Sequence, residues 1–372
     1  KILIANRGEV AVRVLMTCKR MGITAVAAYT YDERDLSWLK DADERVCIGP
    51  ARAYLDQDAL LEAARQTGCS ALHPGWGFLS ENATFAARCE AIGVRFIGPP
   101  AHLIRSMGDK IEARRSMKAL GLDPIPGTDE PLQDVESARK LAAEIGYPVL
   151  LKAASGGGGR GMRRVFEESE LHGAFSEASS EARSSFGDAR LYMEKLIEAG
   201  RHIEFQVIGD CTGRVLVLGE RECSIQRRHQ KLVEESPSPV LGTEQRERVS
   251  AKIASALSAA GYTSAGTVEM LRDSSGELYF MELNTRLQVE HPVTEMTTGI
   301  DLVEWQLRVA ANQRLPENWG PAQGHAIEIR INAEDPNRDF LPTPGQLERF
   351  SFPEGDGIRV ETHLRSGDSV SP

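Results

Sequence analysis

The chain has 372 residues, which is too long for one ordinary hydrophobic core, so two or three domains are expected. Hydrophobic residues make up 41% and charged residues 26% of the sequence, as in ordinary soluble proteins, and the formal net charge is −10. This acidic balance argues against a nucleic-acid partner, and no apolar run reaches the roughly 18 residues that a membrane helix needs. No signal peptide is visible, and the chain starts at Lys1 without an initiator methionine, so we expect a fragment or a trimmed chain.

The first hundred residues alternate short apolar strands with amphipathic helices. Helices are expected over about residues 9–21, over YLDQDALLEAARQTG and around ATFAARCEAIG, and strands at KILIA, TAVAAY, RVCIG, CSALHPG and VRFIG. This alternation predicts a parallel α/β sheet with helices on both faces. The six cysteines form no CxxC pair and show no metal-ligand spacing, which is typical of reduced thiols in a cytoplasmic protein, or in the mitochondrial matrix of a eukaryote.

The remaining chain is expected to be α+β. Residues 101–123 favour a helix, and the Pro/Gly-rich stretch DPIPGTDEPL follows as a linker. Further helices are expected around 244–260 and 301–312, with strands at HIEFQVIGD, RVLVLGERE, GTVEML and LYFMELN. The sequence therefore predicts four segments: an α/β domain over 1–100, a helical linker over 101–130, a small α+β subdomain over 131–197, and a larger body over 198–372.

A glycine-rich stretch, KAASGGGGRGMRRV, contains the pattern GxGxxG in Gly156, Gly158 and Gly161. A dinucleotide-binding turn requires a strand before these glycines and a helix directly after them. Here strands are expected on both sides, so a hairpin tip that covers ATP phosphates is favoured, with a flexible surface loop as the alternative. Lys152 ends the preceding strand, from which its ammonium group can reach a phosphate.

Polar residues recur at every second position between Glu282 and Glu290. In an extended chain, Glu282, Asn284, Arg286, Gln288 and Glu290 would share one face, while Met281, Leu283, Leu287 and Val289 would lie on the other. Such a strand would extend about 26 Å, which is too far for one metal cluster. We therefore expect two tasks, one for Glu282 and Asn284 and another for the residues from Arg286 to Glu290.

Glu269, in the neighbouring strand GTVEML, is expected to face Glu282. Two carboxylates and an amide oxygen on rigid strands suit Mg²⁺ that is shared with nucleotide phosphates. Together with Lys152 and a glycine cover, these residues provide the parts of a phosphoryl-transfer site.

Eight motifs in this order make the chain resemble a known family. They are ANRGEVAVR, HPGWGFLSEN, MGDK, KAASGGGGRGM, RHIEFQV, QRRHQKLVEE, MELNTRLQVEHPVTE and RINAEDP. The chain closely resembles the biotin carboxylase component of biotin-dependent carboxylases, a member of the ATP-grasp superfamily, from Lys1 to Pro372. The resemblance implies an N-terminal pre-ATP-grasp domain, a glycine-rich lid over 131–197, and an ATP-grasp body with an incomplete C-terminal domain.

The resemblance also implies a reaction and its residues. MgATP (or MnATP) and bicarbonate would give carboxyphosphate, which carboxylates N1 of biotin on a carrier protein. The ATP ligands implied are Lys110, Lys152, Gly156, Gly157, Gly158, Gly159, Gly161, Glu194, Lys195, Ile197, His202, Gln226 and His229. The implied metal ligands are Glu269, Glu282 and Asn284.

Bicarbonate would be held by Lys231, Arg286, Gln288 and Val289, with Glu290 as the general base and Arg330 facing biotin. Bicarbonate is a poor nucleophile until it loses its proton, so a carboxylate base beside cations suits this role. A biotin carboxyl carrier protein or domain, a carboxyltransferase, and a homodimer or larger complex are the implied partners.

Several alternatives remain at this stage. Another ATP-grasp carboxylate–amine or carbamoyl-phosphate-forming ligase, or a non-catalytic nucleotide-binding subunit, would share some of these motifs. His73 and Trp76 in HPGWGF are interpreted as structural, and Met117-Lys118 as part of a plain helix rather than a biotinylation site. The segment GIDLVEWQLRVA is similar to acyl-CoA carboxylases and favours an acyl-CoA as final carboxyl acceptor, although pyruvate and urea systems share this component.

The sequence departs from the family pattern in two places, with Trp76 in place of the usual Tyr, and EESPSP (234–239) in place of EEAPAP. The resemblance also implies a longer C-terminal domain than the residues up to Pro372 provide.

Overall fold

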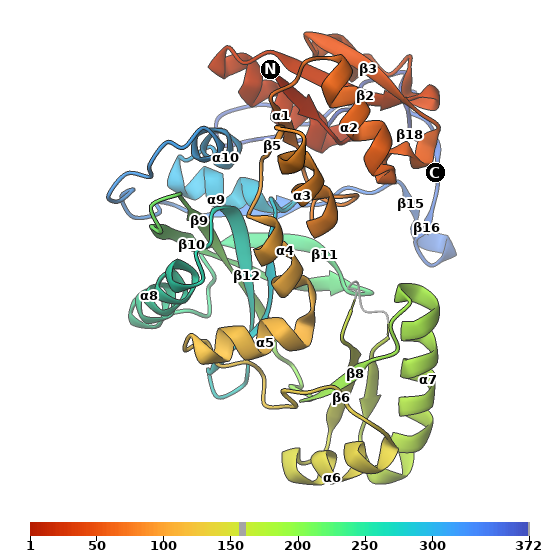
Figure 1. Ribbon diagram of the computed structural model, residues 1–372, viewed down its shortest axis with the longest axis vertical. Helices are drawn as coiled ribbons and strands as arrows, with labels where there is room; N and C mark the ends of the chain where they lie inside the picture. Colours follow the sequence, from red (N-terminus) through yellow and green to blue (C-terminus); the bar gives the residue numbers. More distant parts are fainter. Residues whose placement is uncertain (156–160, 371–372) are drawn as a thin grey trace. The chain divides into compact units, whose positions relative to one another are not determined.

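The computed structural model describes residues 1–155 and 161–370. These residues form two compact units, whose elements are drawn in Figure 1. The first unit contains Lys1–Ala101, Asp301–Arg314 and the residues from Arg330 onward, and the second contains His102–Ile300 and Leu315–Ile329. Both units therefore combine segments that are distant in the sequence.

A five-stranded parallel sheet forms the centre of the first unit, in the order β3-β2-β1-β4-β5. Leu3, Val26 and Leu72 have no exposed surface, as expected for parallel strands. The strands are β1 (Ile2–Ile4), β2 (Ala25–Thr30), β3 (Glu44–Gly49), β4 (Ala71–His73) and β5 (Arg95–Phe96). The helices between them are α1 (Gly8–Met21), α2 (Gln57–Gln66) and α3 (Ala83–Ala91). The predicted α/β alternation is confirmed.

The loops that follow β1 and β4 are locked together. Asn6 Nδ2 donates hydrogen bonds to the carbonyl oxygens of Pro74 and Trp76, both at 2.7 Å. Gly75 has φ +64°, and a Cβ there would lie 2.8 Å from Asn6 Nδ2, so glycine is required. His73 is fully buried, and burial lowers its pKa to about 4. These contacts support the structural interpretation of HPGWGF.

The lid subdomain of the second unit is a three-stranded antiparallel sheet with the order β7-β6-β8. Its elements are α6 (Val135–Ile145), β6 (Val149–Ala153), β7 (Arg163–Val165), α7 (Glu168–Phe186) and β8 (Leu191–Lys195). Strands on both sides of the glycine run are thus confirmed. Gly161 has φ +68° and its carbonyl oxygen accepts a hydrogen bond from Ala153 N, whereas Gly156, Gly157, Gly158 and Gly159 lie outside the described residues.

A six-stranded antiparallel sheet forms the body of the second unit, in the order β13-β12-β9-β10-β11-β14. Its strands are β9 (Arg201–Gly209), β10 (Val215–Arg227), β11 (Gln230–Ser236), β12 (Ser264–Arg272), β13 (Leu278–Asn284) and β14 (Ala326–Ile329). One face packs its apolar side chains, such as Phe205 and Val268, against Met117 of α5 and Ile253 of α8. Figure 1 shows these two helices beside the sheet. These two helices are α5 (Lys110–Ala119) and α8 (Thr243–Ala259).

The helix expected over 101–123 is two helices. α4 (Ala101–Gly108) ends before Asp109, whose side chain caps α5 by accepting hydrogen bonds from the backbone N of Ile111 and Glu112. In α5, Met117 is buried in the core and Lys118 forms an exposed ion pair with Asp129. These contacts support the interpretation of this segment as a plain helix.

The prediction of one long polar strand from Glu282 to Glu290 is wrong for the residues beyond Asn284. β13 ends at Asn284, the chain turns, and helix α9 (His291–Thr298) begins directly after Glu290. A bulge at Met281 also breaks the alternation, because Glu282 pairs with Glu269 while Phe280 pairs with Met270. Phe280 therefore joins the core and Met281 stays half-buried, which period two alone could not predict.

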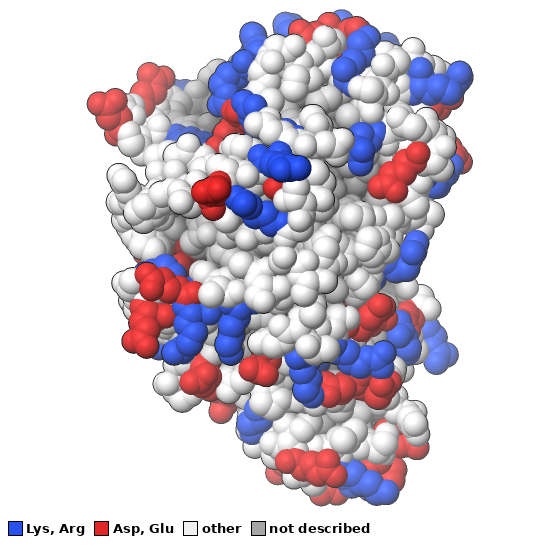
Figure 2. Space-filling view, turned by 60° about the vertical axis from the view of Figure 1, so that its left-hand side comes forward, with Lys and Arg blue, Asp and Glu red and all other residues white. Residues whose placement is uncertain are grey.

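The C-terminal part of the chain contributes α10 (Leu302–Ala310) to the first unit, close to the predicted helix over 301–312. Short strands follow, namely β15 (Glu334–Asp335), β16 (Leu341–Pro342), β17 (Gly345–Gln346) and β18 (Ser369–Val370). None of the helices in the described ranges is both long and apolar enough to cross a bilayer. On the face that Figure 2 shows, acidic and basic side chains are interspersed.

Asp301 joins α1 to α10 within the first unit. It caps α10 by accepting a hydrogen bond from Glu304 N at 2.7 Å, and it pairs with the buried Arg13 at 2.9 Å and with Arg20 at 2.8 Å. Burial would raise the pKa of Asp301, but Arg13 and the hydrogen bonds lower it from 3.8 to about 2. The ionised carboxylate therefore stabilises the folded unit.

We expect Asp301→Asn to lower the free energy of unfolding by about 2 kcal/mol at neutral pH, because asparagine keeps the helix cap but removes the charge. A lowered pKa stabilises the fold above the unfolded value near 4 and loses this effect as the pH falls toward about 2. The difference between the two proteins, measured by urea unfolding, should therefore shrink below about pH 4.

Asp56→Asn is the matched control, because Asp56 caps α2 at an exposed position. We expect it to change stability by less than about 0.5 kcal/mol. Equal losses for the two variants, or a loss for Asp301→Asn that does not depend on pH, would contradict the role assigned to the ion pair.

Candidate active site

Three glutamates on neighbouring strands lie in register across the six-stranded sheet. Glu269 on β12 is paired directly with Glu204 on β9 and with Glu282 on β13. Residues opposite each other on antiparallel strands share a face, and like charges in such pairs are destabilising. Glu204 is fully buried and Glu269 is 6% exposed, so this carboxylate row requires positive charge close by.

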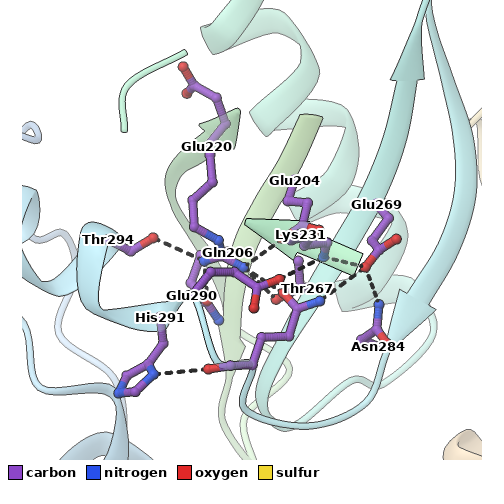
Figure 3. Close-up of polar contacts among 12 residues, drawn as sticks. Glu204, Gln206, Glu220, Lys231, Thr267, Glu269, Asn284, Glu290, His291 and Thr294 are labelled. Carbon is purple, nitrogen blue, oxygen red and sulfur yellow. Dashed lines mark hydrogen bonds and ion pairs between the residues drawn. The ribbon is translucent and has the colours of Figure 1, made fainter. Parts of the chain in front are cut away.

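Lys231 on β11 supplies part of this charge. Its Nζ contacts the carboxylate of Glu204 and lies 3.1 Å from Glu269 Oε1 and 2.6 Å from Glu290 Oε1 (Figure 3). Burial alone would lower the pKa of Lys231, but the three carboxylates raise it well above its ordinary value. Lys231 therefore remains protonated and links Glu290 to the carboxylate row.

His202 is the second cation at the row. Its Nε2 lies 3.1 Å from Glu204 Oε1 and 3.0 Å from Glu269 Oε2. Burial would lower its pKa, but Glu269 and Glu204 raise it to about 10. Gln226 Nε2 lies 3.2 Å from His202 Nδ1, so these two predicted nucleotide ligands are brought together. His229 lies exposed in the turn between β10 and β11, and its assignment to the nucleotide stays a prediction.

The predicted metal ligands lie at the other end of the row. Glu269 and Glu282 are directly opposite each other, and Asn284 Nδ2 donates a hydrogen bond to Glu269 Oε1 at 2.8 Å. Two facing carboxylates with an amide beside them are a hard-oxygen donor set that fits Mg²⁺. His202 lies close to Glu204 and Glu269, and these three side chains form a second group with metal-ligating atoms near one another.

The predicted phosphate-binding lysines are each paired with a glutamate. Lys110, the first residue of α5, contacts the Glu282 carboxylate, and Lys152 Nζ lies 3.0 Å from Glu194 Oε2. Glu194 is fully buried and also accepts a hydrogen bond from Arg114 at 2.5 Å. The carboxylate of Glu194 thus holds two cations.

Lys195 and Ile197 follow Glu194 along the chain. Lys195 Nζ donates hydrogen bonds to the carbonyl oxygens of Gly146 and Tyr147, both at 2.9 Å, which fixes the end of β8 to the turn between α6 and β6. Ile197 is half-buried. The structure places neither side chain against the carboxylate row, and their assignment to adenine stays a prediction.

The turn after β13 carries the predicted bicarbonate ligands. Arg286 Nη2 donates a hydrogen bond to Asn284 Oδ1 at 2.9 Å, and Gln288 Nε2 donates one to Glu269 Oε1 at 3.0 Å. Val289 is half-buried, and its carbonyl oxygen lies 3.2 Å from His291 Nδ1. Because the chain turns here, Glu290 contacts Lys231 beside the carboxylate row instead of lying at the far end of a strand.

Sequence reasoning missed two residues at the centre of this site, Glu204 and Arg221. His202, Glu204 and Gln206 alternate along β9, so the period-two argument used for Glu282 and Asn284 would have found Glu204. Arg221 has no such local signal. It is fully buried, and its position beside Glu204 depends on the pairing of β10 with β9.

Arg330, predicted to face biotin, belongs to the first unit. There burial and Glu361 raise the pKa of the Glu9 carboxyl, and the positive charge of Arg330 lowers it without cancelling that rise. Its relation to the carboxylate row stays a prediction. Lys231 and Glu290 lie beside this row of carboxylates, and such an arrangement of carboxylates and cations suits the activation of an anion against a nucleotide phosphate.

Three family models match consecutive parts of the chain. "Biotin carboxylase, N-terminal domain" matches residues 1–104, "Carbamoyl-phosphate synthase L chain, ATP binding domain" matches 109–318, and "Biotin carboxylase C-terminal domain" matches 328–372. Biotin carboxylase matches on both sides of the ATP-binding domain favour this family over a carbamoyl-phosphate-forming ligase.

Named relatives match along the whole chain. Biotin carboxylase of Pseudomonas aeruginosa is 49% identical, over 100% of this chain and 84% of the relative. The 2-oxoglutarate carboxylase small subunit of Hydrogenobacter thermophilus is 50% identical, over 100% of this chain and 80% of the relative. One of the pyruvate carboxylase subunits of Methanothermobacter thermautotrophicus is 48% identical, over 100% of this chain and 77% of the relative.

Solved structures agree with these matches. The biotin carboxylase–β-γ-ATP complex from Campylobacter jejuni has a TM-score of 0.97 at 48% identity, over 99% of this chain and 83% of that one. The biotin carboxylase domain dimer of Hydrogenobacter thermophilus 2-oxoglutarate carboxylase, with MgADP, ADP and bicarbonate, has a TM-score of 0.96 at 49% identity, over 100% of this chain and 83% of that one. With matches to all three domain models and relatives 48–50% identical along its full length, this chain belongs to the biotin carboxylase family of ATP-dependent ligases, in the ATP-grasp superfamily.

Proposed function

We propose that the residues around Lys231 use MgATP and bicarbonate to form carboxyphosphate, which then carboxylates N1 of biotin on a carrier protein. One observation carries this assignment of residues. Lys231 joins Glu290 to the row formed by Glu204, Glu269 and Glu282, so that a base, a cation and metal-binding oxygens meet at one place (Figure 3). A non-catalytic nucleotide-binding subunit would not need this arrangement.

ATP is proposed to bind between the lid and the carboxylate row. Lys110 and Lys152 would exchange their carboxylate partners, Glu282 and Glu194, for phosphate oxygens. The glycine run 156–161 would cover the phosphates. The residues proposed beside the rest of the nucleotide are Glu194, Lys195, Ile197, His202, Gln226 and His229.

Glu269, Glu282 and Asn284 are proposed to hold Mg²⁺ or Mn²⁺, which when bound neutralises charge on the transferred phosphoryl group. Asn284 Oδ1 accepts a hydrogen bond from Arg286 in this structure. Binding a metal through this oxygen would end its hydrogen bond with Arg286, whose Nη2 could then donate to an anion.

Bicarbonate is proposed to lie against Lys231, Arg286, Gln288 and the backbone of Val289. Glu290 takes its proton, and the bicarbonate oxygen attacks the γ-phosphorus of ATP as the bond to ADP breaks. Carboxyphosphate then splits into CO₂ and phosphate, and the phosphate removes the N1 proton of biotin. N1 attacks CO₂, and Arg330 would stabilise the negative charge on the biotin oxygen.

We expect Glu290→Gln to reduce bicarbonate-dependent ATP cleavage by about 100-fold or more, because the amide cannot accept the bicarbonate proton. Phosphate release with free biotin measures the activity, and calorimetry should show that ATP binding is retained. Glu235→Gln is the control, since Glu235 lies on the neighbouring β11 and pairs with the exposed His325. Unchanged turnover in Glu290→Gln would remove this residue as the base.

Glu282→Gln should raise the Mg²⁺ concentration for half-maximal activity by about tenfold or more, because one anionic oxygen ligand is lost. The measurement is a Mg²⁺ titration at saturating ATP, repeated with Mn²⁺. Glu277→Gln, in the exposed turn between β12 and β13, should leave this value unchanged. If Glu282→Gln behaves like the control, Glu282 is only the partner of Lys110.

The partners proposed are a biotin carboxyl carrier protein or domain and a carboxyltransferase, with an acyl-CoA as the final acceptor and a homodimer as the unit of assembly. GIDLVEWQLRVA supports the acyl-CoA, and the dimer described for the Hydrogenobacter thermophilus domain supports the dimer. Relatives named for 2-oxoglutarate and pyruvate make 2-oxo acids the competing acceptors. Assaying the reconstituted carboxylase with acetyl-CoA, propionyl-CoA, pyruvate and 2-oxoglutarate decides between them.

A further inference from the structure

A fully buried guanidinium group lies directly behind the bicarbonate ligands. Arg221 on β10 has no exposed surface, and its two terminal nitrogens donate hydrogen bonds to side chains from β9, β12, α9 and the turn before α9. Figure 3 shows several of these acceptors gathered at one point. The acceptors are Gln206 Oε1 at 2.6 Å, Thr294 Oγ1 at 3.0 Å, Gln288 Oε1 at 2.6 Å, Thr267 Oγ1 at 3.1 Å and Glu204 Oε2 at 3.2 Å.

These contacts determine which way the Gln288 amide faces. Its oxygen accepts from Arg221, and its nitrogen donates to Glu269 Oε1 at 3.0 Å. Arginine has only donors and an ionised carboxylate only acceptors, so a flipped amide would set donor against donor and acceptor against acceptor. Arg221 and Glu269 therefore leave Gln288 with a free N–H, and a bicarbonate anion requires a donor.

The two carboxylate oxygens of Glu204 have different cationic partners, one of which is the Arg221 guanidinium. Oε2 accepts from Arg221, while Oε1 contacts Lys231. Glu204 is fully buried and pairs with Arg221 directly across β9 and β10. Arg221 neutralises part of the negative charge of Glu204, so Glu204 attracts Lys231 less strongly. The positive charge of Lys231 then acts more on Glu290 and on a bound anion.

Thr294 connects this group to the base. It lies on α9, one turn after Glu290, and accepts a hydrogen bond from Arg221 Nη1. The guanidinium thus holds the helix that begins beside Glu290 against the sheet that carries Lys231.

We propose that Arg221 is a positioning residue of the bicarbonate site: it fixes the Gln288 amide as a donor and holds Glu204 and α9 in place around Lys231 and Glu290. This inference rests on the proposed function, which assigns Lys231, Gln288 and Glu290 to bicarbonate. Lysine cannot replace Arg221, because a single ammonium group cannot reach acceptors on four elements at once.

The test is Arg221→Lys in the whole chain, with bicarbonate-dependent ATP cleavage measured in the presence of free biotin. We expect the KM for bicarbonate to rise by about tenfold or more, because buried hydrogen bonds from a charged group are lost, while the KM for ATP changes by less than about twofold. Arg246→Lys is the matched control. Arg246 Nε lies 2.8 Å from both oxygens of Glu220, the neighbour of Arg221 on β10. The Arg246→Lys substitution therefore alters a similar arginine–glutamate pair that contacts none of the proposed bicarbonate ligands.

Thr294→Val is a second variant, which keeps Arg221 and removes only one acceptor. Thr294→Val should raise the KM for bicarbonate about fivefold and leave the KM for ATP unchanged. If Arg221→Lys does not fold, Thr294→Val alone tests the positioning role of Arg221. An unchanged KM for bicarbonate in a folded Arg221→Lys, or in Thr294→Val if the first variant does not fold, overturns the inference. An equal rise for ATP and bicarbonate also overturns it, because that is the effect of a general structural role.

Failure of the proposed function would look different from failure of this inference. In that case the wild-type chain itself would show no ATP cleavage that depends on bicarbonate. A wild type that is active and whose KM for bicarbonate does not respond to the Arg221 and Thr294 variants contradicts the inference alone.

Discussion

The second unit depends on one electrostatic constraint, namely that Glu204, Glu269 and Glu282 are held in register on adjacent strands. Three carboxylates on one face repel one another, and burial strengthens the repulsion because water no longer screens it. The sheet keeps this register because cations are placed along it. Arg221 and Lys231 lie at the Glu204 end, and Lys110 lies at the Glu282 end.

The same cations explain how a stable fold can contain a reactive site. Buried ion pairs add little net stability, but removing one partner leaves a costly buried charge. Lys110 and Lys231 therefore hold the glutamates in place, and under the proposed function anionic substrates would compete for these two lysines. A divalent cation between Glu269 and Glu282 would take over the role of Lys110, which releases its ammonium to a phosphate. Substrate binding would thus be an exchange of charge partners that leaves few buried charges unpaired.

The sequence predicted most elements but not how they meet. The βα alternation of the first hundred residues and the strands around the glycine run follow from local patterns, as does the pair Glu269–Glu282. The bulge at Met281 and the turn after Asn284 do not, because they depend on packing of Phe280 and on contacts of Glu290 with Lys231. The position of Arg221 could not be predicted for the same reason, since its contact with Glu204 depends on the register of β10 against β9.

The residues of this site do not identify the final carboxyl acceptor, because the proposed chemistry never brings the acceptor into the site. In the proposed reaction the carboxylate row would act only on ATP and bicarbonate, and the carboxyl group would leave on biotin and its carrier. Relatives named for 2-oxoglutarate and pyruvate are as similar to this chain, at 50% and 48% identity, as the relative named only biotin carboxylase, at 49%. GIDLVEWQLRVA, the segment that favours an acyl-CoA, includes α10 of the first unit and none of the row. Under the proposed function, the site would determine which nucleotide and anion react, and acceptor specificity would come from the carboxyltransferase that the carrier reaches.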